Sequence, residues 1–307
     1  MDELELLLTA HGGVLARATA AAVGVSSDDL GRWTRAGRLV RVRRGAFVDR
    51  RLYQAAAPTE RYRLRVSAVM ATRPRGDLAG YHAALALRAL PLWRVDLARI
   101  DVMAEVAGDF AESGVWFHPR GAVTGERAAS GSTVTVARAL VQTAAAGHVE
   151  AAVIAGDAAL AQGLCAVGDL TAELHTGSRV RGHRRAARMI DLCDGRSESV
   201  GESRPRILLR GAGLPVRSQV SLGNDQAMLA RVDLLVGEGV VVELDGAVKY
   251  AGDASGRALF EEKRREDRLR ELGFEVVRVT WADLDHPERV LAKVGAALAR
   301  ADRRRSS

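Results

Sequence analysis

Three acidic residues lie within two short stretches that otherwise predict buried β-strands. The stretch "VVELDGAVKY" (residues 241–250) follows "RVDLLVGEGV", and together they contain Asp233, Glu243 and Asp245. Buried strands are normally near-continuous runs of apolar residues. Carboxylate oxygens are the ligands that hard divalent cations such as Mg²⁺ prefer, so a metal site is one chemistry that these acids could serve.

Two of the acids are predicted to face each other across a hairpin. Regular alternation along the first strand places Asp233 on the face opposite to Val232 and Leu234. If "GEG" is the turn, centred on Glu238, equal counting outward sets Asp233 directly across from Glu243. Like charges directly opposed on a sheet destabilise it, so this pair needs a cation between its two members.

Two kinds of cation would meet this need. We predict Mg²⁺ or Mn²⁺, bound by Asp233, Glu243 and Asp245. The alternative is an exposed sheet face whose acids form salt bridges with Arg231 or Arg264. Asp245 also suits a plain turn at the strand end, and a one-residue slip in register would undo the pairing.

A third carboxylate, Glu202, opens the predicted helix before these strands. In "SVGE" it stands three residues after Ser199, which is the spacing of a capping box. Glu202 is therefore predicted either to cap this helix or to complete the metal site, because one carboxylate cannot do both well at once.

A concentrated basic segment lies near the N-terminus. Between Gly31 and Arg51 the chain has eight Arg against one acid, Asp49, and this excess of seven equals the net charge of +7 of the whole chain. Clustered positive charge attracts a phosphate backbone, so we predict contacts with double-stranded DNA; the alternative is a small helical bundle whose arginines are merely solvated. The predicted contact residues are Arg32, Arg35, Arg38, Arg41, Arg43 and Arg44.

The elements around this segment predict a winged helix-turn-helix domain over residues 1–57. The sequence indicates a helix, a turn at Gly24, a second helix capped by Ser26 or Ser27, and a stop at Gly37. "RLVRVRRGAFV" then alternates around a glycine turn, as a two-stranded wing does.

Residues 58–178 predict a middle domain of mixed α+β structure in which we identify no chemistry. His82 and His118 stand alone in the sequence, and such histidines are more often structural than catalytic. "RVRGHRRAARMIDLCDGRSES", residues 179–199, predicts a basic helix that is either solvated or in contact with nucleic acid. Helices are expected at 59–72, 80–90, 135–146 and 149–162, and strands at "RIDVMAEV" and "GVWFHP".

Residues 195–302 predict a third domain with the element order αβββαβα. Gly273 ends its long charged helix, and Pro287 lies in the first turn of the last helix. Phe274 and Trp281 flank the final strand, and we expect both to be core residues. The predicted fold class of the whole chain is therefore mixed α/β.

This last domain resembles a known nuclease-like family. The pattern "GESRPRILLRGAGLP…ARVDLLV…VVELDG…EDRLRELGFEVVRVTW" is similar to the PD-(D/E)XK domain of unknown function related to very-short-patch-repair endonucleases, over about residues 195–300. The resemblance implies a restriction-endonuclease-like fold in which Glu202, Asp233 and Glu243 bind one or two Mg²⁺ ions. It also implies attack of a metal-activated water on a phosphodiester.

One position departs from the family pattern. The family's Lys would fall at Asp245, and Lys249 stands where this branch usually has a His. Lys249 is therefore predicted either to orient the attacking water in catalysis or to be an ordinary surface residue. The substitution bears on cleavage more than on the fold.

The N-terminal part resembles the winged-helix domain of AbiEi-type antitoxins, and "GYHAALALRALPLW" with "TVTVARALVQTAA" is similar to the segment that follows it in them. Such proteins repress their own operons by binding DNA, so the resemblance implies DNA and a toxin as partners. Two functions are therefore expected: a Mg²⁺-dependent DNA endonuclease in defence or repair, or an antitoxin-like repressor whose nuclease-like domain is inactive. Convergence of the three acids would discriminate between them.

Other classes of protein find no support in the sequence. Cys165 and Cys193 form no CxxC pair and the seven His form no HExxH motif, which argues against a disulfide framework and a structural zinc site. The acidic start "MDELELLLTAHGG" lacks the pattern of a secretory signal, and no apolar run reaches membrane length. We therefore expect a cytoplasmic protein without a membrane partner.

Overall fold

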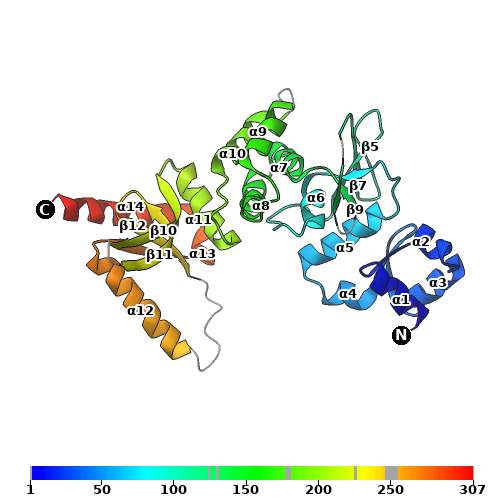
Figure 1. The fold of residues 1–307 in the computed structure, drawn as a ribbon, viewed down its shortest axis with the longest axis horizontal. Coiled ribbons are helices and arrows are strands. Elements are labelled where there is room, and N and C mark those ends of the chain that lie inside the picture. Colours follow the sequence, from blue (N-terminus) through cyan, green and yellow to red (C-terminus); the bar gives the residue numbers. More distant parts are fainter. Residues whose placement is uncertain are drawn as a thin grey trace. The chain divides into compact units, whose positions relative to one another are not determined.

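Two units make up the computed structural model of the chain (Figure 1). The first contains Met1–Ala155 and Gly163–Asp191, and the second contains Gly156–Gln162 and Leu192–Ser307. In the described segments, none of the helices has the length and apolar character needed to cross a lipid bilayer. The structure describes residues 2–123, 125–128, 131–176, 181–224, 227–245 and 255–306.

The N-terminal part of the first unit combines a three-stranded antiparallel sheet with three helices. The strand order is β1-β3-β2. Leu4, Leu15, Leu30, Leu39 and Phe47 are buried together and form its core. The elements are α1 (Glu3–Ala10), β1 (Val14–Ala16), α2 (Arg17–Ala22), α3 (Ser27–Arg35), β2 (Leu39–Arg43) and β3 (Ala46–Asp49).

Local sequence signals fix the start of α3 and the turn of the hairpin. A capping box between Ser26 and Asp29 begins α3, so Ser26 is the cap of the two serines that the sequence allows. Strands β2 and β3 are joined through Arg44 and Gly45, and Gly45 has a φ of +79°, a left-handed conformation that favours glycine. The turn therefore holds Arg44 at the tip of the hairpin.

The rest of the first unit is a mixed six-stranded sheet flanked by helices. The strand order is β6-β7-β5-β4-β9-β8, and β5 runs parallel to β7. The helices predicted at 59–72, 80–90, 135–146 and 149–162 are confirmed as α5, α6, α7 and α8. The elements are α4 (Arg50–Ala55), α5 (Pro58–Met70), β4 (Leu78–Ala79), α6 (Tyr81–Leu87), β5 (Ile100–Ala104), β6 (Phe110–Glu112), β7 (Val115–Pro119), β8 (Glu126–Ala128), β9 (Gly131–Thr133), α7 (Val136–Ala145), α8 (Val149–Ala161), α9 (Val167–Thr176) and α10 (His183–Leu192).

The second unit follows the predicted order of helix, three strands, helix, strand and helix, with the short helix α13 added. Strands β10, β11 and β12 pair antiparallel, whereas β12 and β13 pair parallel, so this sheet is also mixed. The mixed α/β fold class is confirmed at that level. The elements are α11 (Val200–Gly211), β10 (Val216–Asn224), β11 (Ala227–Val236), β12 (Val240–Asp245), α12 (Ser255–Glu271), β13 (Glu275–Thr280), α13 (Trp281–Leu284) and α14 (Pro287–Arg305).

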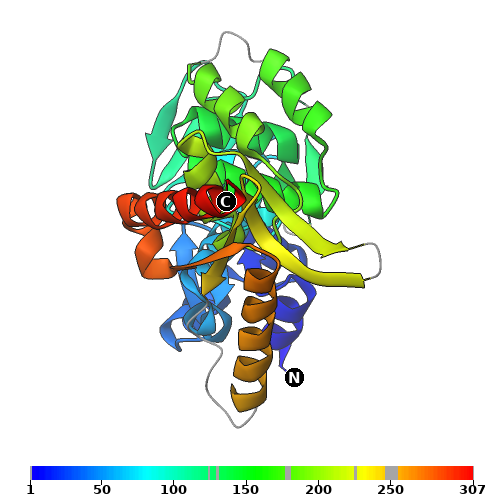
Figure 2. The ribbon, with the colours of Figure 1, turned by 90° about the vertical axis from the view of Figure 1, so that its left-hand side faces the viewer.

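Helices cover both faces of the sheet in the second unit. Val240 and Val242 of β12 pack in one cluster with Val294 of α14, whereas Val241 packs in another with Leu269 of α12. The alternation predicted for β12 is therefore confirmed. Figure 2 shows these two helices, α14 in red and α12 in orange, with the β10–β11 hairpin in yellow.

Of the two aromatic residues expected in the core, one lies at the surface. Phe274 is half-buried and packs against the cluster that contains Leu269 and Val241. Trp281 begins α13 and is 38% exposed, and its ring centroid lies 5.7 Å from the guanidinium carbon of Arg204. The prediction of a buried Trp281 is therefore wrong.

A buried ion pair joins the end of α8 to α11 within the second unit. Arg206 is 0% exposed and Asp157 is 1% exposed. The Asp157 carboxylate accepts hydrogen bonds from Arg206, from the Ser203 hydroxyl at 2.5 Å and from the Asp194 amide at 2.7 Å. Removal of one partner would leave the other charge buried, which is a strongly unfavourable state.

Replacement of Arg206 by Ala should lower the free energy of unfolding by about 3 to 5 kcal/mol, because Asp157 then loses its cation inside the core. Arg210→Ala on the same helix is the matched control, and we expect it to cost less than about 1 kcal/mol. Denaturant unfolding followed by circular dichroism measures both variants. Equal losses for the two would show that the buried pair contributes nothing specific.

Candidate functional site

The six arginines of the basic segment fall into two groups in the structure. Arg32 of α3 forms an ion pair with Asp29. Arg38, which follows α3, forms ion pairs with Asp2 and with Glu5 at 4.0 Å. The hydrogen bond from Arg38 is the main reason that the pKa of Asp2 falls to about 2. Two of the six guanidinium groups are therefore already matched by carboxylates of the same chain.

The other four arginines have no carboxylate partner within the described segments. Arg41 on β2 and Arg44 in the turn are exposed, and neither forms an ion pair there. Arg43 is half-buried beside them. Arg35 is exposed on α3, where its Nε donates to the Gly31 carbonyl at 3.3 Å. The hairpin tip thus carries the positive charge that is most available to a partner.

The predicted centre of the β11–β12 hairpin is confirmed. Leu234 pairs with Val242 and Val236 pairs with Val240, which puts Glu238 in the middle of the turn. The paired residues end one step before Asp233 and Glu243, the two acids that equal counting sets across from each other.

The regular alternation predicted for β11 is wrong at Asp233. Val232 packs in one hydrophobic cluster with Leu235, whereas Leu234 belongs to the cluster on the other side of the sheet. Gln219 of β10 lies between the two register pairs that flank Asp233, and its φ of +53° is left-handed. Such a local irregularity redirects side chains in a strand, so the face of Asp233 cannot be obtained by simple counting.

Asp233 lies in an environment that disfavours its negative charge. Burial, followed by the charge of Glu202, raises the pKa of the Asp233 carboxyl group. The positive charge of Arg265 and a hydrogen bond from the backbone of Leu244 oppose this rise. The structure therefore brings two of the predicted acids, Asp233 and Glu202, within electrostatic reach of each other.

An arginine from α12 stands beside the second acid of the hairpin. Arg265 Nη2 lies 2.9 Å from Glu243 Oε1, and the same nitrogen donates to the carbonyl of Arg231. The Arg231 guanidinium itself pairs with Glu198. A salt bridge is thus present at Glu243, as the second alternative expected, and Arg265 forms it.

Glu202 lies in the cap of α11, but its carboxylate bonds the Glu198 amide and the Ser199 hydroxyl in place of the Ser199 amide that a capping box uses. Ser199 is the N-cap of α11 and accepts from the Glu202 amide at 3.3 Å, while its hydroxyl donates to Glu202 Oε1 at 3.0 Å. Glu202 Oε2 accepts from the Glu198 amide at 2.9 Å and from Gln219 Nε2 at 2.7 Å. Both carboxylate oxygens are therefore occupied by protein donors.

The last two residues of the predicted site are Asp245 and Lys249. Asp245 is the last residue of β12 and pairs in register with Thr280 of β13. Lys249 lies outside the described residues. Among the residues that are described, no group of three or more His, Cys, Asp or Glu side chains is placed to hold a metal ion. The donor chemistry suits Mg²⁺, but in this arrangement Arg265 and the helix cap occupy Glu243 and Glu202.

Asp233→Asn should stabilise the protein at neutral pH, because it removes a carboxylate whose charge the fold disfavours. The folded-state pKa is raised, so the wild type regains this stability as the pH falls through that pKa and below the unfolded value near 3.8. The gain should be about 0.5 to 2 kcal/mol, the usual range for a substitution that improves charge interactions. Thermal melts should show a gain in Tm at pH 7 that vanishes near pH 3; a gain independent of pH would contradict the assignment.

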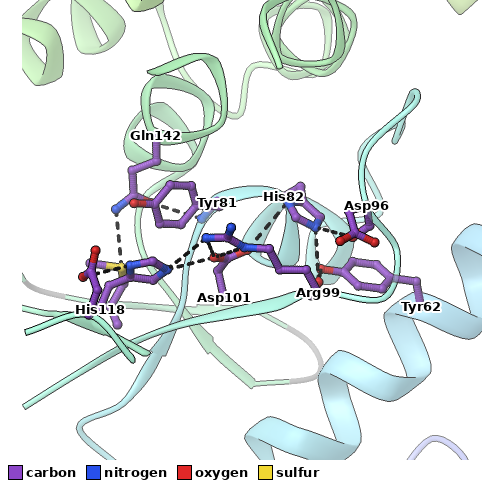
Figure 3. A network of polar contacts seen from close by, with 10 residues as sticks. Tyr62, Tyr81, His82, Asp96, Arg99, Asp101, His118 and Gln142 are labelled. Atoms are coloured by element: carbon purple, nitrogen blue, oxygen red, sulfur yellow. Dashed lines mark hydrogen bonds and ion pairs between the residues drawn. The ribbon is translucent and has the colours of Figure 1, made fainter. Parts of the chain in front are cut away.

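The middle of the first unit contains a polar network that the sequence did not reveal (Figure 3). Asp101 of β5 is 1% exposed, and its Oδ1 accepts from Arg99 Nε and from His118 Nε2, each at 2.8 Å. His118 of β7 also has its Nδ1 3.2 Å from Oδ1 of the exposed Asp109. Burial alone would raise the pKa of Asp101, but the hydrogen bonds from His118 and Arg99 outweigh it and lower the pKa.

The second histidine belongs to the same network. His82 Nε2 lies 3.1 Å from the Asp96 carbonyl and 3.3 Å from the Arg99 carbonyl, and its ring stacks on Tyr62. The Tyr62 hydroxyl donates to the Arg99 carbonyl at 2.7 Å. Burial lowers the pKa of His82, which favours the neutral ring. The expectation that His82 is structural agrees with these contacts.

One signal in the sequence pointed to this network. Asp101 interrupts the apolar run of "RIDVMAEV" just as Asp233 interrupts "RVDLLV". The parallel pairing of β5 with β7, which sets Met103 beside His118, brings the histidine to the acid. That pairing joins segments whose relation a single sequence does not show.

Comparison with known proteins finds no family model and no curated protein that matches the chain. The two family resemblances therefore rest on the quoted motifs alone.

Proposed function

We propose that the N-terminal part of the first unit binds double-stranded DNA through α3 and the β2–β3 hairpin. The order of α1, β1, α2, α3, β2 and β3, with the strand order β1-β3-β2, supports a winged helix-turn-helix. One observation carries the proposal: Arg41 and Arg44 are exposed on the hairpin and have no ion-pair partner in the described part of the chain. Phosphate contacts of this kind supply most of the sequence-independent affinity for DNA.

The six predicted contact residues are not equivalent in this proposal. A guanidinium that is paired with a carboxylate has to give up that pair before it binds a phosphate. Arg32 and Arg38 have such partners, so their contribution to the affinity is expected to be smaller. Arg35, Arg41, Arg43 and Arg44 are the residues on which we expect the interface to depend.

Arg41→Ala combined with Arg44→Ala should weaken binding to duplex DNA and lower the salt dependence of the affinity. Each lost phosphate contact reduces the slope of log affinity against log salt by about 0.9, so the double variant should lose about two units. Gel-shift titrations at several salt concentrations measure both quantities. Arg75→Ala with Arg127→Ala removes the same charge from exposed positions in the same unit and is the matched control; equal effects of the two double variants would contradict the assignment.

For the second unit we propose that the site formed by Glu202, Asp233 and Glu243 serves DNA or partner binding without cleavage, as in an antitoxin-like repressor. Arg265 supports this function, because it supplies beside Glu243 the positive charge that a metal would otherwise provide. The toxin that the resemblance implies remains a prediction.

A Mg²⁺-dependent endonuclease is the second candidate. Burial and then the charge of Glu202 raise the pKa of Asp233, so a divalent cation would relieve the interaction of the two acids, which favours it. If a divalent ion binds, Asp233 and Glu243 would hold it, and Glu202 would join them only on release from its cap. The ion would supply activation of a water for attack on a phosphodiester. The ion pair between Glu243 and Arg265 would have to break first.

Millimolar Mg²⁺ or Mn²⁺ should leave the Tm of the wild type unchanged, and plasmid DNA should stay intact. Arg265→Gln removes the internal cation and should allow the same ions to raise the Tm, since a ligand of the native state stabilises it. Asp233→Asn combined with Arg265→Gln is the control and should abolish that rise. A metal-dependent rise in the wild type, accompanied by cleavage that Asp233→Asn abolishes, would instead establish the endonuclease.

A further inference from the structure

A cavity opens beside the polar network of the first unit. It has a volume of about 630 Å³, within the range of small-molecule sites. Strands β5 and β7, helices α7 and α9 and the start of α10 provide its walls. Four arginines line it, together with two acids: Arg99, Arg138, Arg181 and Arg185, and Asp109 and Glu173. Asp109 is exposed and lies 3.2 Å from His118 Nδ1.

The charges that line this cavity are only partly compensated. Arg99 is matched by the buried Asp101, and Arg138 Nη1 lies 3.2 Å from Glu173 Oε1. Arg181 and Arg185 are exposed at the start of α10 and have no carboxylate partner among the described residues. Two arginines with unmatched charge and planar donor groups therefore border one concave surface.

Close packing fixes the backbone beside these two arginines. Gly182 has a φ of +93°, and a side chain there would place its Cβ 2.2 Å from the Ala145 carbonyl oxygen. Only glycine therefore lets the start of α10 approach the end of α7 so closely. Next to it, His183 lines the cavity with a buried Nδ1 that has no hydrogen-bond partner within the described segments.

The lining of the cavity also contains a residue in a strained conformation. Tyr81 has a φ of +50°, which is unfavourable for a non-glycine residue. Its amide donates to Gln142 Oε1 at 3.1 Å and its ring lies 4.8 Å from that of His118. Burial raises the pKa of Tyr81, so its hydroxyl is a neutral donor. Strain of this kind is commonly kept where it positions a group for binding.

We propose that this cavity binds a small organic molecule that bears a phosphate group. Arg181 and Arg185 provide fork-shaped, charged donors, which match phosphate oxygens in geometry. The apolar walls, formed by Met103, Val141 and Leu174, suit the organic part of such a ligand and offer nothing to a bare ion. The proposal does not depend on DNA binding by the N-terminal helices.

Isothermal titration of the full chain with phosphate, pyrophosphate and mononucleotides tests the proposal. A mononucleotide should bind more tightly than either inorganic ion, because only it fills the apolar walls. Arg181→Ala with Arg185→Ala should weaken this binding by about tenfold or more, the loss expected for a charged contact. Arg184→Ala with Arg188→Ala removes the same charge from exposed positions of α10 outside the cavity and should leave the affinity unchanged.

Tyr81→Phe provides a second variant that keeps the ring and loses only the hydroxyl, and it should weaken mononucleotide binding by roughly two- to tenfold. Absence of binding for all probes at about 10 mM, which corresponds to a negligible affinity, would overturn the proposal. Equal weakening by both arginine pairs would overturn it as well, because it would indicate unspecific attraction. A third outcome would also overturn it: Arg181→Ala with Arg185→Ala lowers the affinity for duplex DNA and leaves the affinity for the mononucleotide unchanged. This result would indicate that α10 contacts DNA.

Discussion

Both units depend on the pairing of carboxylates that are removed from water with positively charged side chains. A carboxylate removed from water has to gain charged or polar donors, because its desolvation otherwise outweighs the packing around it. Three acids meet this requirement through arginine: Asp101 with Arg99, Asp157 with Arg206, and Glu243 with Arg265. Arginine stays charged when buried and presents several donors in a fixed plane, so one residue can satisfy an acid and a carbonyl together. Arg265 does this with Glu243 and the Arg231 carbonyl.

The hairpin of the second unit marks where sequence reasoning succeeds and where it ends. Its centre at Glu238 follows from a short glycine-flanked turn and from period-two alternation, both of which are local properties. The same alternation fails at Asp233, because the left-handed Gln219 in the neighbouring strand disturbs the regular pattern. The identity of the cation beside Glu243 could not be predicted either. Arg265 lies on α12, and the alternation of the strands does not determine where the side chains of that helix lie.

The network around Asp101 shows a different limit. Its members lie on separate elements, and only the parallel pairing of β5 with β7 brings His118 to Asp101. A lone histidine in the sequence is therefore weak evidence both for a structural and for a functional role. An acid within an apolar strand is the stronger signal, because burial of its charge demands a partner somewhere in the fold. Applied to "RIDVMAEV" as it was to "RVDLLV", that rule predicts a compensating group for Asp101, though not which residue provides it.

In a chain whose basic residues are nearly all arginine, residue type alone says little about function. What separates one arginine from another is the presence of an acid within the same fold. Arg38 and Arg206 are matched by carboxylates and hold elements together, whereas Arg41 and Arg181 are exposed and unmatched within the described residues. A charge that the fold does not compensate stays available to an anion from outside. The unmatched arginines occur at the hairpin tip and beside the cavity, so a long polyanion and a small phosphate compound are the two partners that their surroundings suit, one at each place.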